Sequence, residues 1–503
     1  MKKVLSSLAI ALATFVAGGT AFADVVPGKY LVLFKSTKAV QSGSHAQVVR
    51  GLQKANKSNI DLLQQKIAKK GDSITPLWNV NGAVVKASKS ELETIKSLGN
   101  VAFVKPVEYK KWIDPRPATR VIREDAAPVW NIVKVRAPEV WKDYNIDGSG
   151  IVVGHLDTGA AAAHPALKGK VIAFKDFTPA AKPEAYDDQG HGSHTAGTIA
   201  GGNGLGVAPG ARLIVAKVFD KQGGAEDAWL LQAMQWVMDP DGNPETNDAP
   251  LLVSNSWGSD DSTDRVFWDA VNAWVTAGMV PVFAAGNNGP SGKVGTPGGF
   301  PHSWAVAATK KDDTIAYFSS VGPVVWDGQT LVKPDIAAPG YGVISCNTSN
   351  GTVSNMGTSM ACPHVAGLVA LMLQANPKLT IEQVRSLAES TSIDLGTAGK
   401  DNKFGSGRFD AVECIKKVLE TSSLEAAFAA YDRALSAEVA LVGVQQVSPL
   451  AAPLARSLVL RCQGLDDGEF RALSIAVENS GSQAGMKLLR EASALRQAET
   501  LQK

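Results

Sequence analysis

Short apolar runs alternate with helical stretches along the middle of this chain, and this alternation constrains the fold more than any other feature. Strands are predicted at residues 151–156, 213–218, 251–254, 280–284 and 305–308, and helices at residues 226–238 and 265–277. Apolar runs of strand length are typical of strands buried on both faces. Strands that alternate with helices favour parallel pairing. We therefore predict an α/β fold, with a doubly wound, mainly parallel sheet and helices on both of its faces.

Two polar residues follow the ends of these predicted strands. Asp157, in the sequence Asp-Thr-Gly, comes directly after the strand at 151–156, and Asn287 comes just past the strand at 280–284. Open α/β sheets place their binding sites at the carboxyl ends of their strands. An aspartate before a glycine is also common in simple turns. Asp157 alone would therefore not indicate catalysis.

The segment Gly357–Gly367 reads GTSMACPHVAG and leads into an apolar run at residues 368–373. This pattern predicts a loop that turns into a buried helix, with Ser359 at the start of the helix and Pro363 in its first turn. A serine there lies beside unpaired backbone N–H groups and the positive end of the helix dipole, which suit an anion formed next to its oxygen. Taken alone, Ser359 would be interpreted as a helix cap.

Two histidines lie in the segment 188–202, which reads DQGHGSHTAGTIAGG. Glycines flank His191, and the small residues after it indicate a helix packed closely on a neighbour. His194 lies one helical turn beyond His191. No carboxylate or cysteine at helical spacing completes a metal site around the pair. We therefore predict no metal here and expect His194 to be a hydrogen-bonded core histidine.

Asp157, His191 and Ser359 together supply the groups that nucleophilic catalysis needs. A serine hydroxyl is a weak nucleophile and needs a base within hydrogen-bond reach. Histidine suits because its pKa lies near neutral pH, and an aspartate orients it and stabilises the imidazolium. An α/β-hydrolase would have the order serine, acid, histidine, with the serine in G-x-S-x-G. This chain has the order acid, histidine, serine, which disfavours the alternative of a secreted esterase.

Four segments carry a resemblance to a known family: LDTG at 156–159, HGSHTAGT at 191–198, AAGNNG at 284–289 and GTSMACPHVAG at 357–367. The first, second and fourth resemble the three signature motifs of the subtilisin-like serine peptidases, and the third resembles that family's oxyanion-asparagine segment. The resemblance covers residues 130–419. The segment 206–258 is similar to the bacillopeptidase F-like branch of the family.

The resemblance implies a serine endopeptidase that works through an acyl-enzyme. Ser359 would attack the scissile carbonyl, His191 would accept its proton and pass it to the leaving amine, and Asp157 would orient His191. The Asn287 side-chain amide and the Ser359 N–H would hold the oxyanion. The rival interpretation is an inactive relative that binds peptides or has a structural role, which the complete set of four residues argues against.

The resemblance also implies that the substrate adds as a strand between two backbone segments. The residues that match these segments are Gly223, Gly224, Ala225, Ser256, Trp257 and Gly258. The glycines fit simple turns as well, and the two interpretations are compatible. Gly299 matches the family's position at the base of the primary specificity pocket. A glycine there leaves room, so broad specificity that favours large apolar residues before the cut is expected.

The amino-terminal region predicts export and self-inhibition. Residues 1–23 combine two lysines, an apolar stretch and the small-residue ending Ala-Phe-Ala, which predicts a signal peptide cleaved after Ala23 and a secreted protein, extracellular or periplasmic. Residues 24–112 predict the order β-α-β-β-α-β of a small ferredoxin-like α+β sandwich. They resemble the family's inhibitory propeptide, which implies an autoprocessed precursor inhibited by its own propeptide.

The remaining boundaries follow from composition. Residues 109–123 are rich in proline and basic side chains without periodicity, which predicts an exposed segment open to proteolysis. We place a processing linker at 113–125, the catalytic domain at 126–420 and a helical extension at 421–503. In that extension, helices are expected at 423–445 and 468–499.

Composition excludes several classes of partner and leaves some details open. A net charge of +2 gives no reason to expect nucleic acid or a membrane surface, and no apolar run in the body is long enough to span a bilayer. A monomer acting on proteins or peptides is expected. Among the four cysteines, Cys346 and Cys362 are interpreted as buried apolar residues, whereas a Cys414–Cys462 bridge stays open. No cofactor is expected. The resemblance makes the strong calcium site of some relatives doubtful here, because the short segment 201–207 lacks the loop that wraps the ion and Ala166 stands where those relatives place an acidic ligand. A weak structural calcium elsewhere stays open.

Overall fold

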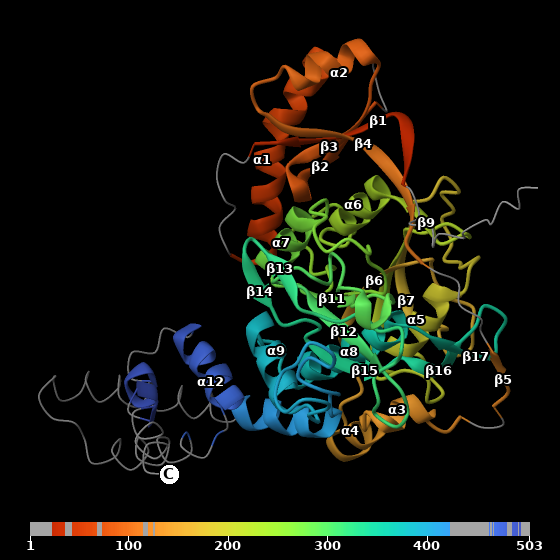
Figure 1. Cartoon of the computed structure of the whole chain (residues 1–503), viewed down its shortest axis with the longest axis vertical. Helices are drawn as coiled ribbons and strands as arrows, with labels where there is room; N and C mark the ends of the chain where they lie inside the picture. The colour runs from red at the N-terminus through yellow and green to blue at the C-terminus, as the bar shows by residue number, and fades with distance from the viewer. Residues whose placement is uncertain are drawn as a thin grey trace, which may run out of the picture.

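The computed structural model describes residues 23–35, 43–67, 73–113, 119–123, 126–422, 462, 465, 467–479, 485–490 and 492–493. We call residues 23–113 the N-terminal domain and residues 126–422 the larger domain. Figure 1 shows the N-terminal domain in red and orange above the larger domain, with α12 (Asp467–Asn479) to one side. The predicted signal peptide lies outside the described residues except for Ala23, and so does the helix predicted at 423–445.

A seven-stranded parallel sheet forms the centre of the larger domain. Its order is β15-β12-β11-β10-β6-β8-β7, and every pairing is parallel. The strands are β6 (Val152–Asp157), β7 (Val171–Asp176), β8 (Arg212–Lys217), β10 (Leu252–Asn255), β11 (Val280–Ala284), β12 (Trp304–Thr309) and β15 (Ile336–Pro339). The prediction of a parallel α/β sheet is confirmed.

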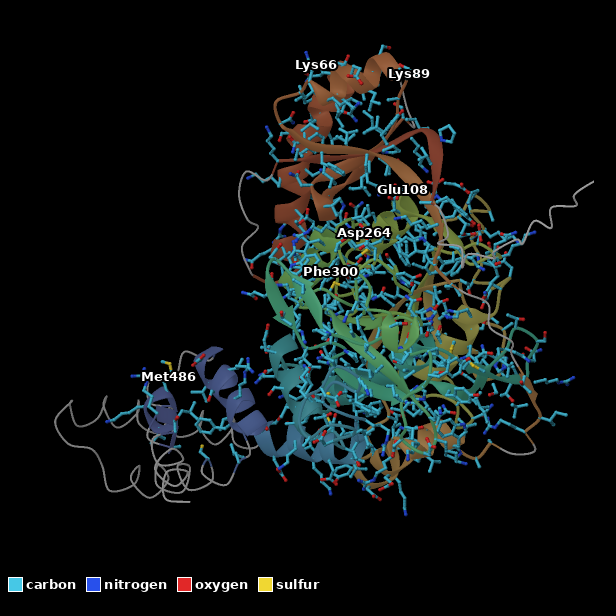
Figure 2. The ribbon with its side chains drawn as sticks, viewed as in Figure 1. Lys66, Lys89, Glu108, Asp264, Phe300 and Met486 are labelled. Atoms are coloured by element: carbon cyan, nitrogen blue, oxygen red, sulfur yellow. The ribbon has the colours of Figure 1, made fainter. Side chains whose placement is uncertain are left out.

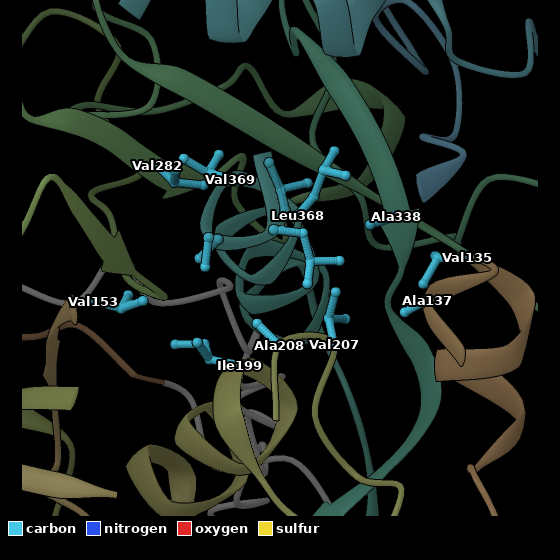
Figure 3. Close-up of a cluster of buried hydrophobic side chains, with 14 of the residues drawn as sticks. Val135, Ala137, Val153, Ile199, Val207, Ala208, Val282, Ala338, Leu368 and Val369 are labelled. Carbon is cyan, nitrogen blue, oxygen red and sulfur yellow. The ribbon is translucent and has the colours of Figure 1, made fainter. Parts of the chain in front are cut away.

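Helices cover both faces of this sheet because successive strand residues point to opposite sides. On β11, Val282 packs into the cluster that contains α5 and α8, whereas Phe283 packs into the cluster that contains α6 and α7. Figure 3 shows Val282 beside Leu368 and Val369 of α8. The helices are α3 (Trp130–Lys134), α4 (Ala137–Tyr144), α5 (His191–Ala200), α6 (Asp227–Trp236), α7 (Trp268–Thr276), α8 (Thr358–Ala375) and α9 (Ile381–Ser390).

The helix α8 is apolar all round because it lies inside the protein. In the described part of the chain it is the one helix long and apolar enough to cross a membrane, yet 83% of it is buried in the protein. A helix that is hydrophobic on every side is expected in the core of a large domain. Its first residues reach the carboxyl ends of the strands, where the predicted site lies.

The N-terminal domain has the predicted order of strands and helices. Its elements are β1 (Asp24–Phe34), α1 (His45–Lys66), β2 (Ile74–Leu77), β3 (Gly82–Lys86), α2 (Lys89–Lys96) and β4 (Val101–Lys111). The strands pair antiparallel in the order β2-β3-β1-β4. Ser44 and Ser88 begin the two helices with capping boxes, in which the serine side chain and a glutamine or glutamate three residues later bond each other's backbone N–H.

The strand β4 runs on into the larger domain. Its end pairs antiparallel with β9 (Gly224–Glu226), so that Tyr109 lies opposite Glu226 and Lys111 opposite Gly224. Trp112 and Ile113 follow and are only 8% and 3% exposed. The prediction of an exposed segment is therefore wrong for Trp112 and Ile113, because the residues that bury them lie far away in the sequence, whereas Lys111 is exposed.

Two smaller sheets lie outside the central sheet and the N-terminal domain. β5 (Thr119–Val121) pairs with β17 (Thr352–Met356), which in turn pairs with β16 (Tyr341–Cys346), so part of the segment predicted to lack structure is a strand. β13 (Val324–Trp326) and β14 (Gln329–Leu331) form a hairpin. In the carboxyl-terminal extension, α12 (Asp467–Asn479) packs against α9.

Candidate active site

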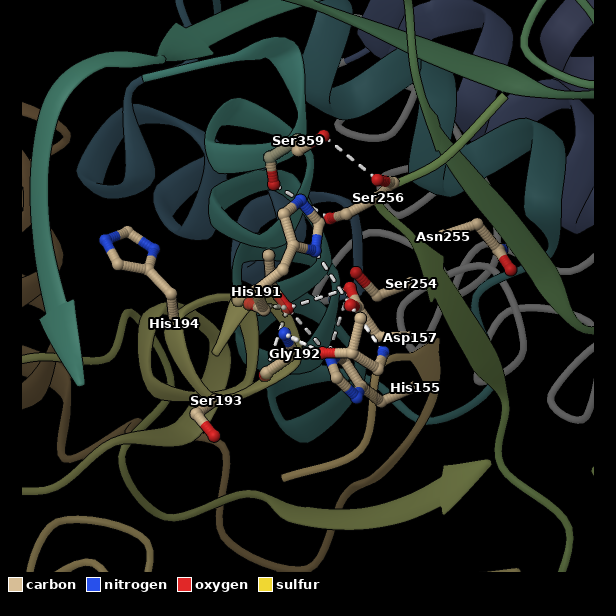
Figure 4. A network of polar contacts seen from close by, with 12 residues as sticks. His155, Asp157, His191, Gly192, Ser193, His194, Ser254, Asn255, Ser256 and Ser359 are labelled. Atoms are coloured by element: carbon tan, nitrogen blue, oxygen red, sulfur yellow. Dashed lines mark hydrogen bonds and ion pairs between the residues drawn. The ribbon is translucent and has the colours of Figure 1, made fainter. Parts of the chain in front are cut away.

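A cleft of about 690 Å³ opens at the carboxyl edge of the parallel sheet. His191, Asn287 and Ser359 line it, and Asp157 lies buried directly behind His191. Asp157 is the last residue of β6, His191 begins α5 and Ser359 lies in the first turn of α8, whereas Asn287 follows β11. Elements that are distant in the sequence thus bring the four predicted residues to one place, and Figure 4 shows Asp157, His191 and Ser359 among them.

Asp157 and His191 form a short charged hydrogen bond. His191 Nδ1 lies 2.7 Å from Asp157 Oδ1, and the Asp157 side chain has no exposed surface. Burial raises the pKa of Asp157, but the charge of His191 and its hydrogen bond outweigh burial, and the pKa ends below its usual value. Asp157 is therefore ionised at neutral pH. An ionised Asp157 accepts from Nδ1–H and leaves Nε2 of a neutral His191 available as a base.

The loop before His191 is held by one carboxylate and one glycine. Asp187 accepts bonds from the backbone N–H groups of Gly190 and Ser193, both at 2.8 Å. Gly192 donates its N–H to Thr158 Oγ1, directly after Asp157. A Cβ on Gly192 would lie 2.1 Å from the Gly159 carbonyl oxygen, so only glycine allows this approach.

Ser359 is held by Ser256 rather than acting as a helix cap. Gly357 occupies the cap position of α8, so the interpretation of Ser359 as a cap is wrong. Pro363 lies inside the helix, beyond the first turn where we predicted it. A proline has no N–H to give to the carbonyl four residues earlier. The carbonyl of Ser359 instead accepts from Ser256 Oγ at 2.8 Å, and Ser359 Oγ donates to the Ser256 carbonyl at 2.9 Å.

The Ser359 hydroxyl and His191 line the same cleft, but no hydrogen bond joins them in the described part of the structure. The proton of Ser359 Oγ is directed at the Ser256 carbonyl. Figure 4 shows the His191 ring beside Ser359 and Ser256, on the cleft side of Asp157. Catalytic hydrogen bonds are often loose without substrate and form in the complex. The serine–histidine contact is therefore expected only in the complex with substrate.

Asn287 is oriented by Thr358, the residue before Ser359. Asn287 Oδ1 accepts from the Thr358 backbone N–H at 2.9 Å and from Thr358 Oγ1 at 3.1 Å. Since the oxygen end is engaged in this way, Nδ2 is the end that remains to donate into the cleft. A preorganised N–H donor beside a nucleophile is the arrangement that stabilises an oxyanion.

The predicted substrate-binding residues divide into three groups. Trp257 and Gly258 line the cleft. Gly224 and Ala225 pair with β4, and the Gly223 carbonyl accepts from the N–H groups of Trp112 and Ile113 at 3.0 and 3.1 Å. Gly299 is not among the residues that line this cleft in the part of the chain described. A Cβ there would instead meet the carbonyls of Val294 and Gly295.

An aromatic pocket beside the cleft was not predicted. The Trp112 ring lies edge-on to Trp257 at 5.8 Å and to Phe267 at 5.6 Å, and Trp112 Nε1 donates to the Ala225 carbonyl at 3.1 Å. Edge-to-face pairs of this kind stabilise beyond the area that they bury. A tryptophan directly after a strand was the available signal in the sequence, but the residues that surround it come from distant segments.

The remaining histidine and cysteine predictions can now be compared with the structure. His194 Nε2 bonds the Val343 carbonyl at 3.0 Å, and burial lowers the pKa of His194 to about 3. The expectation of a hydrogen-bonded core histidine is confirmed. Cys346 and Cys362 are buried, as expected, and the structure contains no Cys414–Cys462 bridge. Across the described ranges, no three or more His, Cys, Asp or Glu side chains converge as a metal site.

Comparison with known proteins identifies the family. The model of the subtilase family matches residues 148–407. The chain belongs to the subtilase family. Bacillopeptidase F of Bacillus subtilis (strain 168) is 33% identical over 407 residues, which cover 73% of this chain and 28% of that protein. Serine protease AprX of the same strain is 35% identical over 301 residues, covering 53% of this chain and 66% of AprX.

Subtilisin NAT of Bacillus subtilis subsp. natto is 30% identical over 379 residues, covering 74% of this chain and 86% of that protein. The match to this subtilase therefore extends over most of its length. The chain spans less than two thirds of bacillopeptidase F and of AprX. The predicted resemblance to subtilisin-like peptidases, and to bacillopeptidase F among them, is confirmed.

Proposed function

We propose that this subtilase is a serine endopeptidase that cleaves proteins through an acyl-enzyme. The observation that carries the proposal is the 2.7 Å contact between His191 and Asp157 at the edge of a cleft that also contains Ser359 and Asn287. Asp157, His191 and Ser359 form the triad, and Asn287 is the oxyanion donor. Family membership supports the reaction class.

In this proposal each group has one role. Ser359 Oγ leaves the Ser256 carbonyl, transfers its proton to His191 Nε2 and attacks the scissile carbonyl carbon. The oxyanion accepts from Asn287 Nδ2 and the Ser359 N–H. His191 then protonates the leaving amine, and a water molecule activated by His191 hydrolyses the ester. Asp157 remains ionised throughout and stabilises the imidazolium.

We propose that the N-terminal domain is an intramolecular inhibitor that occupies the substrate strand site. The end of β4 already pairs with β9, and Trp112 fills the aromatic pocket, as an extended substrate would. Polar contacts also join the two domains: Lys105 Nζ lies 2.7 Å from Asp227, and Tyr109 donates to Asp220 at 2.7 Å. Figure 2 shows Glu108 and Asp264 at the junction of the two domains.

The proposed self-cleavage falls between Ile113 and Thr119. Ile113 lies on the β9 side of the cleft, and Thr119 begins the strand paired with β17, whose residues Val353 and Met356 line the cleft. The two described ends of this interval therefore lie at the cleft or next to residues that line it. This interval lies within the wider predicted region and is consistent with a precursor that cuts itself.

Specificity for large apolar residues before the cut remains a proposal. Gly299 is not among the residues that line this cleft in the described part of the chain, and its role stays a prediction from the resemblance. Gly258, Ala284 and Gly286 line the cleft near Asn287 and provide room for such a residue. Secretion through the signal at residues 1–23, a monomeric state and catalysis that requires no cofactor are proposed on the sequence alone.

An organophosphonate probe tests the proposed reaction. Intact-mass measurement of the wild type should show one covalent adduct, and the Ser359→Ala variant should show none. A wild type that folds and stays unlabelled after removal of the N-terminal domain would contradict the proposal. In that case, binding of the unmodified protein to a peptide, measured by calorimetry, would favour the rival interpretation of an inactive peptide-binding relative.

A further inference from the structure

A second histidine lies behind the carboxylate of Asp157. His155 and Asp157 are two residues apart on β6, so their side chains point to the same face of the sheet. His155 is 1% exposed, and its Nε2 lies 2.8 Å from Thr195 Oγ1. Figure 4 shows His155 on the opposite side of Asp157 from the cleft.

Thr195 connects this histidine to the carboxylate. It lies one helical turn after His191 on α5, so the two side chains reach the same carboxylate. His191 contacts Asp157 Oδ1 at 2.7 Å, and Thr195 Oγ1 contacts Oδ2 at 3.1 Å. The two oxygens of Asp157 are thus approached by two residues of one helix.

Counting protons decides the direction of these bonds. A threonine hydroxyl has one proton, and an ionised carboxylate accepts more strongly than a neutral nitrogen or carbonyl. If Thr195 gave its proton to His155, the contact with buried Oδ2 would have no proton, which is costly for an ionised group. His155 must therefore donate from Nε2–H to Thr195 Oγ1, and Thr195 donates to Asp157 Oδ2.

The neutral state of His155 agrees with its surroundings. With the proton on Nε2, Nδ1 is an unprotonated acceptor, and it is buried without a hydrogen-bond partner within the described residues. An unsatisfied acceptor is tolerated better than an unsatisfied N–H donor. Burial lowers the pKa of His155, which keeps it uncharged at neutral pH.

We propose that His155 and Thr195 form a hydrogen-bonded support that holds the Asp157 carboxylate from behind, with His155 as a positioning residue. The inference rests on the proposed triad. The support draws charge toward Oδ2 and away from the oxygen that faces His191. Without it, the negative charge facing His191 increases, the imidazolium is favoured, and the pKa of His191 rises.

Several charged or titratable groups lie around the pair formed by His191 and Asp157. These groups are Asp157 and His155 on β6, Asp187 and Asp188 in the loop before α5, His194 on α5, Lys217 on β8 and Cys362 on α8. All of them remain in the variants proposed below except His155 itself. A change in the titration of His191 is therefore attributable to the support.

The test compares Thr195→Val and His155→Leu with two matched controls. Thr198→Val removes a buried hydroxyl from the same helix, where Thr198 donates to the His194 carbonyl and not to Asp157. His155→Gln replaces the imidazole with a side-chain amide that retains an N–H donor. Rates on a peptide anilide are normalised to the fraction labelled by the organophosphonate, and the pKa of His191 is measured by ¹⁵N NMR.

We expect Thr195→Val and His155→Leu to lower kcat about 10-fold, with little change in KM. The acid limb of kcat/KM should move to higher pH in both variants, because only neutral His191 acts as a base. Thr198→Val and His155→Gln should retain the wild-type limb. An unchanged His191 pKa in both test variants, or a wild-type His155 with its proton on Nδ1, overturns the inference.

The NMR readout separates this inference from the proposed function. If the wild type neither hydrolyses the anilide nor reacts with the probe, the peptidase proposal fails, yet the tautomer of His155 and the pKa of His191 still support or overturn the hydrogen-bonded support. If the only effect of Thr195→Val is that a smaller fraction of the protein reacts with the organophosphonate, and the measured pKa of His191 is unchanged, then His155 and Thr195 have a merely structural role and the inference is wrong.

Discussion

Ser256 and Ser359 are joined by two reciprocal hydrogen bonds, each hydroxyl donating to the carbonyl of the other residue. The arrangement follows from Pro363, which gives the Ser359 carbonyl no helical partner. Ser256, which directly follows β10, thereby fixes the first turn of α8. Because Pro363 offers no N–H, the Ser359 carbonyl is free to accept the hydrogen bond from Ser256 Oγ.

Ser256→Ala should destabilise the fold by about 1–3 kcal/mol, because it leaves the Ser359 carbonyl without its hydroxyl donor. Urea unfolding of the Ser359→Ala background, which prevents self-digestion, measures the change. Pro363→Ala supplies an N–H to that carbonyl, so Ser256→Ala should cost less when added to Pro363→Ala. Equal costs in the two backgrounds would contradict this account.

The Ser359→Ala precursor should remain uncut, whereas the wild type should give a new amino terminus between residues 114 and 119. The reason is that the two described ends of this interval lie at the cleft or next to its lining, since Ile113 bonds to Gly223 and Thr119 pairs with β17. Intact mass and amino-terminal sequencing of the purified proteins locate the cut. Maturation of purified Ser359→Ala at the same position would show that self-processing is wrong.

Trp112→Ala should loosen the N-terminal domain from the larger domain by about 2 kcal/mol or more, since an aromatic anchor in a desolvated pocket dominates an interface. Hydrogen exchange of residues 101–113 in the Ser359→Ala background should increase accordingly. Phe103→Ala is the matched control, because Phe103 lies on the same strand and is 53% exposed. If hydrogen exchange is similar in the two variants, Trp112 is not the anchor of this interface.

Asp157→Asn should destabilise the Ser359→Ala protein by about 1.5–3 kcal/mol at neutral pH, the range for hydrogen bonds to a charged group. The folded-state pKa of Asp157 lies below its usual 3.8. A lowered carboxyl pKa contributes stability above the unfolded value, and that stability is lost as pH falls through the folded value. The difference between the two proteins, measured by urea unfolding, should therefore persist above pH 3.8 and shrink below it. A difference that grows with acid would contradict the assignment.

Local patterns were sufficient to predict most of the larger domain. The apolar run before Asp157 is β6, and the run at 280–284 is β11, since buried strands need nothing more than consecutive apolar residues to be recognised. Small residues after His191 and the apolar run after Ser359 predicted the helices α5 and α8. These features depend on neighbours in the sequence, which is why they could be predicted.

Features that depend on distant partners were missed. The sequence of residues 109–113 resembles a linker, and only the structure shows that residues 109–111 pair with β9. The sequence around Ser359 resembles a helix cap, and only the structure shows that its hydroxyl donates to the Ser256 carbonyl. Nothing in the sequence distinguishes His155 from the other residues of its apolar strand. Only the structure shows that His155 contacts Thr195, which in turn contacts Asp157.

The order of residues along this chain was enough to establish its family, its parallel sheet and the chemical types gathered for the proposed reaction, because strand burial and motif spacing are properties of adjacent residues. Folding in three dimensions decided which carbonyl holds the Ser359 hydroxyl, which strand occupies the cleft and what lies behind Asp157. Hydrogen bonds act over about 3 Å, so their partners are defined only once distant segments are brought together.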